Sequence, residues 1–195
     1  MPLNTDLLPA REMSLVFSIY LLKSECWSSE EFNVRIVATW VSLLFLINPI
    51  LQTMVTVMTT MASVEPSMGK PTLKDDDAAL GDVTGIMTMN SPQMKGSFAL
   101  TFPAPAIFDI VKRMLGEEIN ELNDTAKDMA GEMTNMVVGG AKNIYVEQGY
   151  DFDMSTPNII TGKDHKVEHE CNGKTIVLPF NIEGQEFFVE LCFDE

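Results

Sequence analysis

The sequence predicts an α+β fold, in which three helices pack on a largely antiparallel six-stranded sheet to form a two-layer domain. Three observations support this prediction. The chain has 195 residues, 46% of them hydrophobic, which suffices for one core of ordinary size. Apolar residues recur at helical spacing in three segments, and six others have the character of extended strands. These segments follow one another as one helix, three strands, two helices and three strands, an order typical of two-layer α+β domains.

The first predicted element is a helix over residues 48–63. Asn48 suits its N-cap and Pro49 its first turn, and apolar residues then recur at helical spacing. Residues 1–44, by contrast, show weak periodicity and no turn signals, and they are too few for an independent core. We therefore interpret 1–44 as an N-terminal extension that is not part of the domain, which spans 45–195.

The later elements are predicted from the same kinds of pattern. Residues 71–90 are typical of two extended segments around an Asp-rich turn, and 94–103 of a third strand. A second helix is predicted over 104–116, where a glycine ends it, and a third helix begins near Asn123. The last three predicted strands, separated by turns that contain glycine, cover residues 158–170, 174–183 and 185–194. The final strand is strongly apolar, so we expect it to need protection at the sheet edge.

The charge of the chain excludes several classes of partner. A net charge of −15 argues against nucleic acid and anionic membranes, which are bound by clustered Lys and Arg. The apolar runs at 15–22 and 36–47 are too short to span a bilayer, and no secretory signal pattern is present. The three cysteines lie far apart without a CxxC pair, which favours a reducing compartment. The sequence therefore predicts a cytoplasmic protein whose partner is another protein or a small molecule.

The third helix carries the most informative pattern, because one of its faces combines a carboxylate, an amide and a glycine. At about 100° per residue, Asp128, Glu132, Asn135, Gly139 and Lys142 fall within about 80° of arc. The apolar side chains of the same helix fall on the other side, which is wide enough to pack on a sheet. We therefore expect the polar face to meet something outside the domain.

Glycines in the same helix support this expectation. A glycine inside a helix costs roughly 1 kcal/mol relative to alanine, so a helix with several of them needs a reason for each. By its angle, Gly140 faces the core, and Gly139 faces outward beside Asn135. We predict that Gly140 permits close packing inside the domain, whereas Gly139 permits the close approach of a partner.

Other candidate sites are weaker. His165 and His169 lie four apart in a predicted strand, roughly 13 Å along the chain, so we interpret them as surface residues rather than metal ligands. The acidic stretch 74–82 lacks the ligand spacing of a calcium loop and is interpreted as a solvated turn. The sequence contains no GxSxG, no P-loop and no cysteine with a plausible histidine partner. We expect no metal and no cofactor of the protein's own.

The polar face resembles a known family. Asp128, Glu132, Asn135 and Pro157 match the D/S-x-x-x-E-x-x-N…P signature of the CheC/CheX/FliY chemotaxis phosphatases, with 21 residues between Asn135 and Pro157. The flanking sequences "NPIL", "KGSFALTF" and "GQEFFVELCF" are also similar, and the resemblance covers roughly residues 46–193. It implies a CheC-like fold and a homodimer, for which we expect pairing at the sheet edges.

The resemblance also implies an activity, which is the hydrolysis of the phospho-aspartate of a CheY-like response regulator. Glu132 and Asn135 would be catalytic, with Asn135 orienting the attacking water and Glu132 pairing with a lysine of the receiver domain. Asp128, Gly139 and Lys142 would contact the receiver, which brings its own Mg²⁺. The alternative is a non-enzymatic scaffold of the same fold, as found among flagellar switch proteins. Intact Glu132 and Asn135 favour the aspartyl-phosphate phosphatase.

Overall fold

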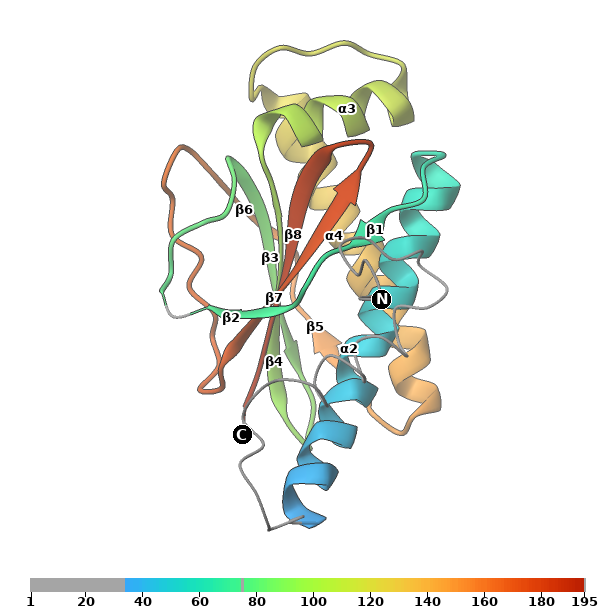
Figure 1. Cartoon of the computed structure of the whole chain (residues 1–195), viewed down its shortest axis with the longest axis vertical. Helices are drawn as coiled ribbons and strands as arrows, with labels where there is room; N and C mark the ends of the chain where they lie inside the picture. Colours follow the sequence, from blue (N-terminus) through green and yellow to red (C-terminus); the bar gives the residue numbers. More distant parts are fainter. Residues whose placement is uncertain (1–33, 75, 195) are drawn as a thin grey trace, which may run out of the picture.

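The computed structural model describes residues 34–74 and 76–194, with side chains described from residue 45 onward. Figure 1 shows two layers, a twisted sheet and a set of helices, which confirms the predicted α+β class. The described helices are α2 (Val34–Met61), α3 (Ala104–Leu115) and α4 (Asp124–Glu147). The described strands are β1 (Ser67–Met68), β2 (Thr72–Lys74), β3 (Val83–Asn90), β4 (Lys95–Phe102), β5 (Asp153–Met154), β6 (Asn158–Thr161), β7 (Thr175–Ile182) and β8 (Gln185–Phe193).

The sheet is antiparallel throughout its described pairs, in the order β1-β7-β8-β4-β3-β5, with β2 also paired to β7 and β6 to β3. It has eight strands rather than the six predicted, because β1 and β5 are two-residue pairings that are too short to leave an alternating pattern. The β7–β8 hairpin turns at Glu183 and Gly184, both with positive φ, as a tight two-residue turn requires.

The position of the last strand differs from the expectation. β8 lies between β7 and β4 in the interior of the sheet, so it does not need protection as an edge strand. Its side chains alternate, and one set packs into the core, where Phe187 stacks between Phe102 and Phe180 at centroid distances of 5.5 Å and 5.2 Å. The core-facing apolar residues of β8 are therefore buried within the domain.

Residues 158–170 are also arranged differently from the single long strand predicted. β6 ends at Thr161, after which Gly162 (φ 130°) and Asp164 (φ 60°) turn the chain away from extended pairing. Only an isolated bridge between Ala78 and Lys166 follows. The apolar spacing of this stretch was too weak to reveal the break.

The predicted start of the first helix at Asn48 is wrong, because α2 begins at Val34 and contains Pro49 within it. Proline is favoured in the first turn of a helix. Inside a helix it removes one backbone hydrogen bond and crowds the preceding turn, but the helix can continue through it, so a proline does not always mark a helix start. α2 therefore crosses the boundary drawn between residues 44 and 45. Residues 1–33 of the predicted extension lie outside the described residues.

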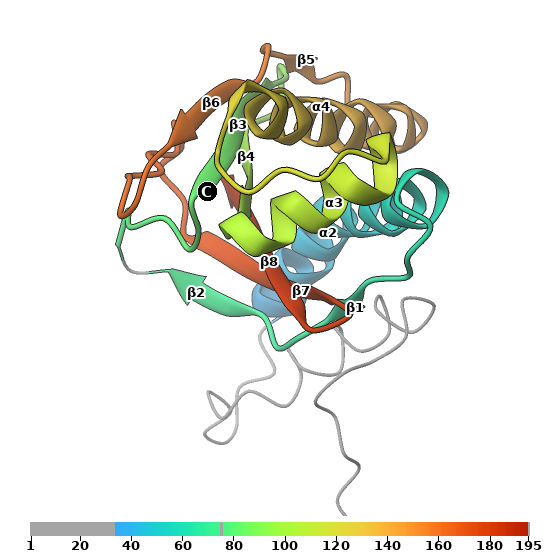
Figure 2. The ribbon, with the colours of Figure 1, turned by 90° about the horizontal axis from the view of Figure 1, so that it is seen from above.

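The helices α2 and α4 lie side by side on one face of the sheet, and α3 crosses its end (Figure 2). Alternate residues of the central strands point into this layer, and their neighbours point to the opposite face of the sheet. Among the described helices, none is both long and apolar enough to cross a membrane. The fold thus leaves α4 with one buried side and one side directed outward.

Candidate active site

The helix α4 is well defined at its start, close to the candidate residues. Asn123 caps it, because its side-chain oxygen accepts a hydrogen bond from the backbone N–H of Ala126 at 3.1 Å. Asp124 lies in the first turn and pairs with Lys127 at 3.0 Å. An acidic group at this end also suits the positive pole of the helix dipole. The residues that follow are thus presented on a rigid element rather than on a loop.

The structure brings the five candidate residues to one face of this helix. Asp128, Glu132, Asn135 and Gly139 are exposed, and Lys142 is half-buried beside them. Glu132 and Asn135 are three residues apart, so their Cα atoms are separated by about 4.5 Å along the helix axis. The opposite side is buried, as the sequence predicted, with Met129, Met133 and Val137 in the core.

Two close contacts hold α4 in place on either side of Asn135. On the sheet side, Gly85 of β3 lies against Thr134, and a Cβ on this glycine would overlap the Thr134 hydroxyl, which donates to the carbonyl of Ala130 at 2.7 Å. On the α2 side, Gly140 lies against the methyl group of Thr53. At each contact a threonine side chain fills the space that a glycine leaves open, so α4 packs closely against both neighbours, and this fixes its depth.

The two adjacent glycines have the different surroundings that the sequence predicted. A Cβ on Gly140 would collide with Thr53 of α2, whereas a Cβ on Gly139 would have nothing within 4 Å. Gly140 is therefore required by packing inside the domain. Gly139 is not required by any contact within the described part of the chain.

Pro157, the last member of the sequence signature, lies close to the same helix through β6. It immediately precedes this strand, which pairs with β3 and contacts α4. The side chain of Ile159 lies where a Cβ on Gly131 would meet it at 3.2 Å, one residue before Glu132. Pro157 has a fixed φ and so helps to set the direction in which β6 enters this contact.

The opposite face of the sheet holds a buried polar cluster that the sequence did not reveal. Glu190 of β8 is fully buried and accepts hydrogen bonds from Lys74 at 2.7 Å and from His169 at 3.2 Å. His169 also contacts the hydroxyl of Ser97 at 2.9 Å through its other ring nitrogen. The interpretation of His169 as a surface residue is therefore wrong, because its side chain is only 6% exposed.

His165 takes part in different contacts from His169. Its ring nitrogens lie 2.7 Å from the Thr84 hydroxyl and 2.7 Å from the carbonyl of Gly162. Within the residues that the structure describes, no three His, Cys, Asp or Glu side chains gather as a metal site. The signal that could have found the cluster is Glu190, which interrupts the apolar run 187–193 of β8 at a position that alternation assigns to the face away from the helices.

Two cysteines meet beside this cluster. Cys171 and Cys192 form a disulfide with a Cα–Cα distance of 6.2 Å, although they are 21 residues apart. The bond joins β8 to the segment after β6. Their spacing gave no sign of this pairing, which depends on how the chain returns to β8.

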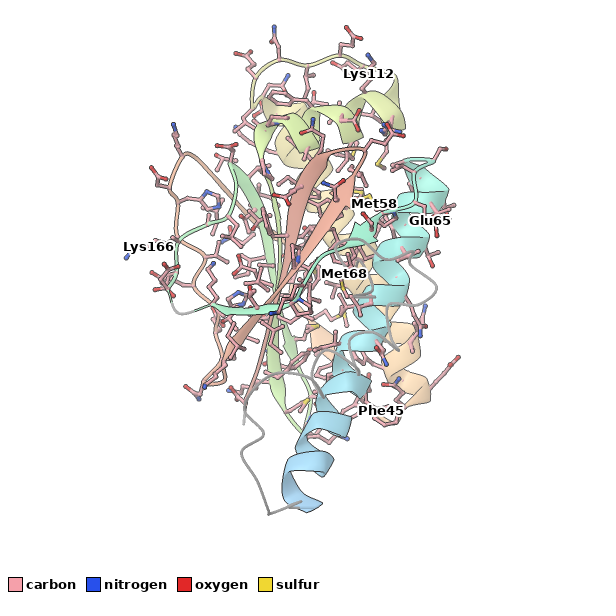
Figure 3. The ribbon with its side chains drawn as sticks, in the orientation of Figure 1. Phe45, Met58, Glu65, Met68, Lys112 and Lys166 are labelled. Atoms are coloured by element: carbon pink, nitrogen blue, oxygen red, sulfur yellow. A yellow bond between two sulfur atoms is a disulfide. The ribbon has the colours of Figure 1, made fainter. Side chains whose placement is uncertain are left out.

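A shallow hollow of about 450 Å³ lies on the same side of the molecule. Its lining includes Thr88, Ser97, Asn158, Lys166 and Glu168. Figure 3 shows Lys166 at the margin of the molecule, on the side away from Phe45 of α2. Ser97 already contacts His169, so its hydroxyl is engaged within the domain.

Comparison with known proteins gives a consistent result. Residues 83–181 match the family model described as chemotaxis phosphatase CheX. The chain is 44% identical to the chemotaxis protein CheX from Vibrio vulnificus, whose crystal structure is similar with a TM-score of 0.70 over 76% of this chain and 98% of that one. It is 24% identical to the CheY-P phosphatase CheX of Thermotoga maritima over 73% of this chain and 91% of the relative.

A second similar structure contains a partner. The crystal structure of the CheX–CheY–BeF₃–Mg²⁺ complex from Borrelia burgdorferi includes a chain with a TM-score of 0.63, 23% identity, and coverage of 76% of this chain and 97% of that one. At this identity the likeness supports the fold. The matched family region contains all of α4 and the strands on which it packs.

Proposed function

The chain belongs to the CheX family of chemotaxis phosphatases, and from this premise we propose that it removes the phosphoryl group from the phospho-aspartate of a CheY-like response regulator. The observation that carries the proposal is the position of Glu132 and Asn135, one turn apart on the exposed face of a helix whose depth is fixed by its neighbours. The CheY-P phosphatase of Thermotoga maritima, a relative, supports the same reaction.

The reaction needs little chemistry from this protein. Water attacks the phosphorus, the bond between phosphorus and the aspartyl oxygen breaks, and inorganic phosphate leaves while the carboxylate of the receiver is restored. An amide is not a general base at neutral pH, so Asn135 contributes by holding the water in line with the bond that breaks. This suffices because an acyl phosphate is already an activated substrate.

Glu132 has a different role in the proposal. Its carboxylate pairs with the active-site lysine of the receiver and so sets the register in which α4 enters. Asp128 and Lys142 support the contact on either side, and Gly139 lets the two backbones approach. The Mg²⁺ that neutralises the phosphoryl oxygens belongs to the receiver, and this chain needs no cofactor of its own.

The proposal is tested by adding the protein to a panel of phosphorylated receiver domains from the same cell and following the loss of phosphate. We expect faster release from at least one receiver, with the added protein acting at substoichiometric amounts. If no receiver loses phosphate faster, although some bind, the scaffold interpretation replaces the phosphatase.

We also propose that the protein forms a homodimer whose subunits pair at the sheet edges, as the family resemblance implies. Its support in this chain is that the outer strands β2 and β6 are short and each has a partner on only one side among the described strands. Leu73 of β2 is also 56% exposed, an unusual position for a large apolar residue on an edge strand.

The cytoplasm is the proposed location, as the lack of a CxxC pair among the three cysteines indicated. Disulfides rarely persist in that compartment, so we expect Cys171 and Cys192 to be largely in the thiol form in the cell. Alkylation of lysates under non-reducing conditions, followed by mass spectrometry, measures the fraction that is paired. A fully paired population would argue for an oxidising compartment.

A further inference from the structure

The exposed row on α4 continues beyond the candidate catalytic residues. Asp128, Glu132, Asn135 and Gly139 follow one another at spacings of four, three and four, and Val146 lies seven residues after Gly139 on the same line. Val146 is therefore about 16 Å from Asn135 along the helix axis. A partner that contacts the first half of this row lies close to the second half as well.

Gly139 indicates that a partner comes close between these two points. It is exposed, and a Cβ placed on it would meet nothing within 4 Å. A helix loses stability by having glycine here instead of alanine, and no contact within the described chain compensates for that loss. A backbone or bulky side chain of another molecule lying against the helix at this point gives the glycine a reason.

Val146 is the next exposed residue on the same line, and it is apolar. Val146 is 53% exposed. The described chain has six exposed large hydrophobic residues, and of these Val146 is the one on α4. Single exposed apolar residues are common on protein surfaces, so exposure alone carries no conclusion. Its position in line with Asn135 and Gly139 is what distinguishes it from the others.

We propose that Gly139 and Val146 form the second half of the docking surface for the phosphorylated receiver domain, in which receiver backbone lies over Gly139 and an apolar receiver side chain covers Val146. This rests on the proposed function. The occupant follows from continuity with the residues that enter the receiver's active site. That active site lies at the carboxyl ends of the strands of an α/β sheet, where loops gather, so a straight helix that reaches it passes over the adjacent loops.

The two halves of the row contribute to different steps. Asn135 acts on the water, so its contribution exists mainly in the transition state. The Val146 contact forms when the proteins associate and is unchanged during the chemistry, so it contributes equally to the ground state and the transition state. Val146 therefore determines affinity and the choice among receivers, and leaves the rate of the saturated complex unchanged.

The test is Val146→Ser, which removes the apolar contact with little effect on helix propensity. Affinity is measured on a beryllofluoride-treated receiver, and phosphate release is measured at saturating and subsaturating enzyme. We expect binding about tenfold weaker, as for a moderate interface contact, and an unchanged rate at saturation. Leu115→Ser on α3 is the matched control, because Leu115 is 57% exposed and lies off the row, and it should alter neither quantity.

The other possible results distinguish a failure of the docking surface from a failure of the phosphatase proposal. Binding of Val146→Ser as tight as that of the unaltered chain, or a loss of rate at saturation, refutes the docking surface. A change of mass in light scattering assigns Val146 to a contact between copies of this chain and refutes it too. If Val146→Ser weakens binding but the unaltered chain releases no phosphate, the docking surface stands and the phosphatase does not. If the unaltered chain binds no receiver, both are wrong.

Discussion

Asn135 is the residue on which the enzymatic proposal depends most directly. Because an amide only positions water, replacing it removes an interaction that is made in the transition state and leaves the association of the two proteins intact. We expect Asn135→Ala to reduce the acceleration of phosphate release by about 100-fold, the scale of a lost positioning group. Affinity for the beryllofluoride-treated receiver should change by less than about twofold. Full acceleration by Asn135→Ala would refute the mechanism.

Glu132 should behave differently, because its carboxylate meets the receiver's lysine before the chemistry begins. Glu132→Ala should weaken binding by about 2 kcal/mol or more, roughly 30-fold, as for a desolvated charge pair across an interface. Turnover should fall as well, since the register is lost. Glu132→Gln keeps the shape of the side chain and one acceptor, so its affinity and turnover should lie between those of the unaltered chain and of Glu132→Ala. Equal binding by all three forms, measured by titration calorimetry, would exclude the charge pair.

The candidate site could be predicted at this scale because it is local. Asp128, Glu132 and Asn135 share a face through helical periodicity alone, and the structure places them together on the exposed side of α4. The sequence marks Glu190 as unusual in an apolar strand, but its pairing with Lys74 and His169 could not be predicted. Its members come from separate strands and a loop, more than 100 residues apart in one case, and only the strand order brings them together.

Gly140 and Gly139 give a matched pair of variants for the element that carries the site. Gly140→Ala places a methyl group against Thr53, whose rotamer is held by its hydrogen bond to the carbonyl of Pro49 at 2.8 Å. Overpacking costs about 1–3 kcal/mol, and the gain in helix propensity of roughly 1 kcal/mol does not offset it fully. We expect a lower melting temperature, measured by calorimetry, and recovery in Gly140→Ala/Thr53→Ala.

The neighbouring change serves as the control. Gly139→Ala meets no atom of this chain, so the melting temperature should rise or stay the same, and affinity for the receiver should fall. A melting temperature that falls equally in both variants would show that the two glycines do not differ as the structure indicates.

One buried hydroxyl links α2 to α4, in addition to the contact of Gly140 with Thr53. Tyr145 is fully buried and donates to the carbonyl of Leu46, in the turn of α2 before Pro49. Burial raises the pKa of this hydroxyl, so it stays a neutral donor at all pH values at which the protein is handled. Tyr145→Phe should cost about 1–3 kcal/mol in the free energy of unfolding, because a buried carbonyl loses its partner. Urea denaturation measures this, and an unchanged midpoint would contradict it.

Most helices and strands could be predicted from periodicity, and the exceptions have identifiable causes. The first helix begins at Val34 rather than Asn48, because Pro49 has the same sequence appearance in a first turn and inside a helix. The strand expected over 158–170 breaks at Gly162 because that glycine and Asp164 adopt positive φ. Both differences depend on the backbone conformation of single residues, which composition does not fix.

At the scale of the whole molecule, the proposed homodimer gives a direct measurement. Light scattering at micromolar concentration should give twice the mass of the chain. Leu73→Lys places a charge on the exposed edge strand β2 and should shift the mass toward the monomer without unfolding the domain. Leu115→Lys, on α3 away from both edges, should leave the dimer intact. A monomer mass for the unaltered chain would exclude the dimer.

The position of β8 has a consequence for how the protein is made. This strand, which ends at Phe193, lies between β7 and β4, so the centre of the sheet is incomplete until Phe193 has left the ribosome. Until then β4 lacks one neighbour and Phe102 and Phe180 lack the ring of Phe187 between them, so apolar side chains of the core remain exposed to chaperones and proteases. Premature termination before Gln185 should therefore produce degraded chains rather than weakly active ones. The cell would then contain the complete domain or no stable form of the protein.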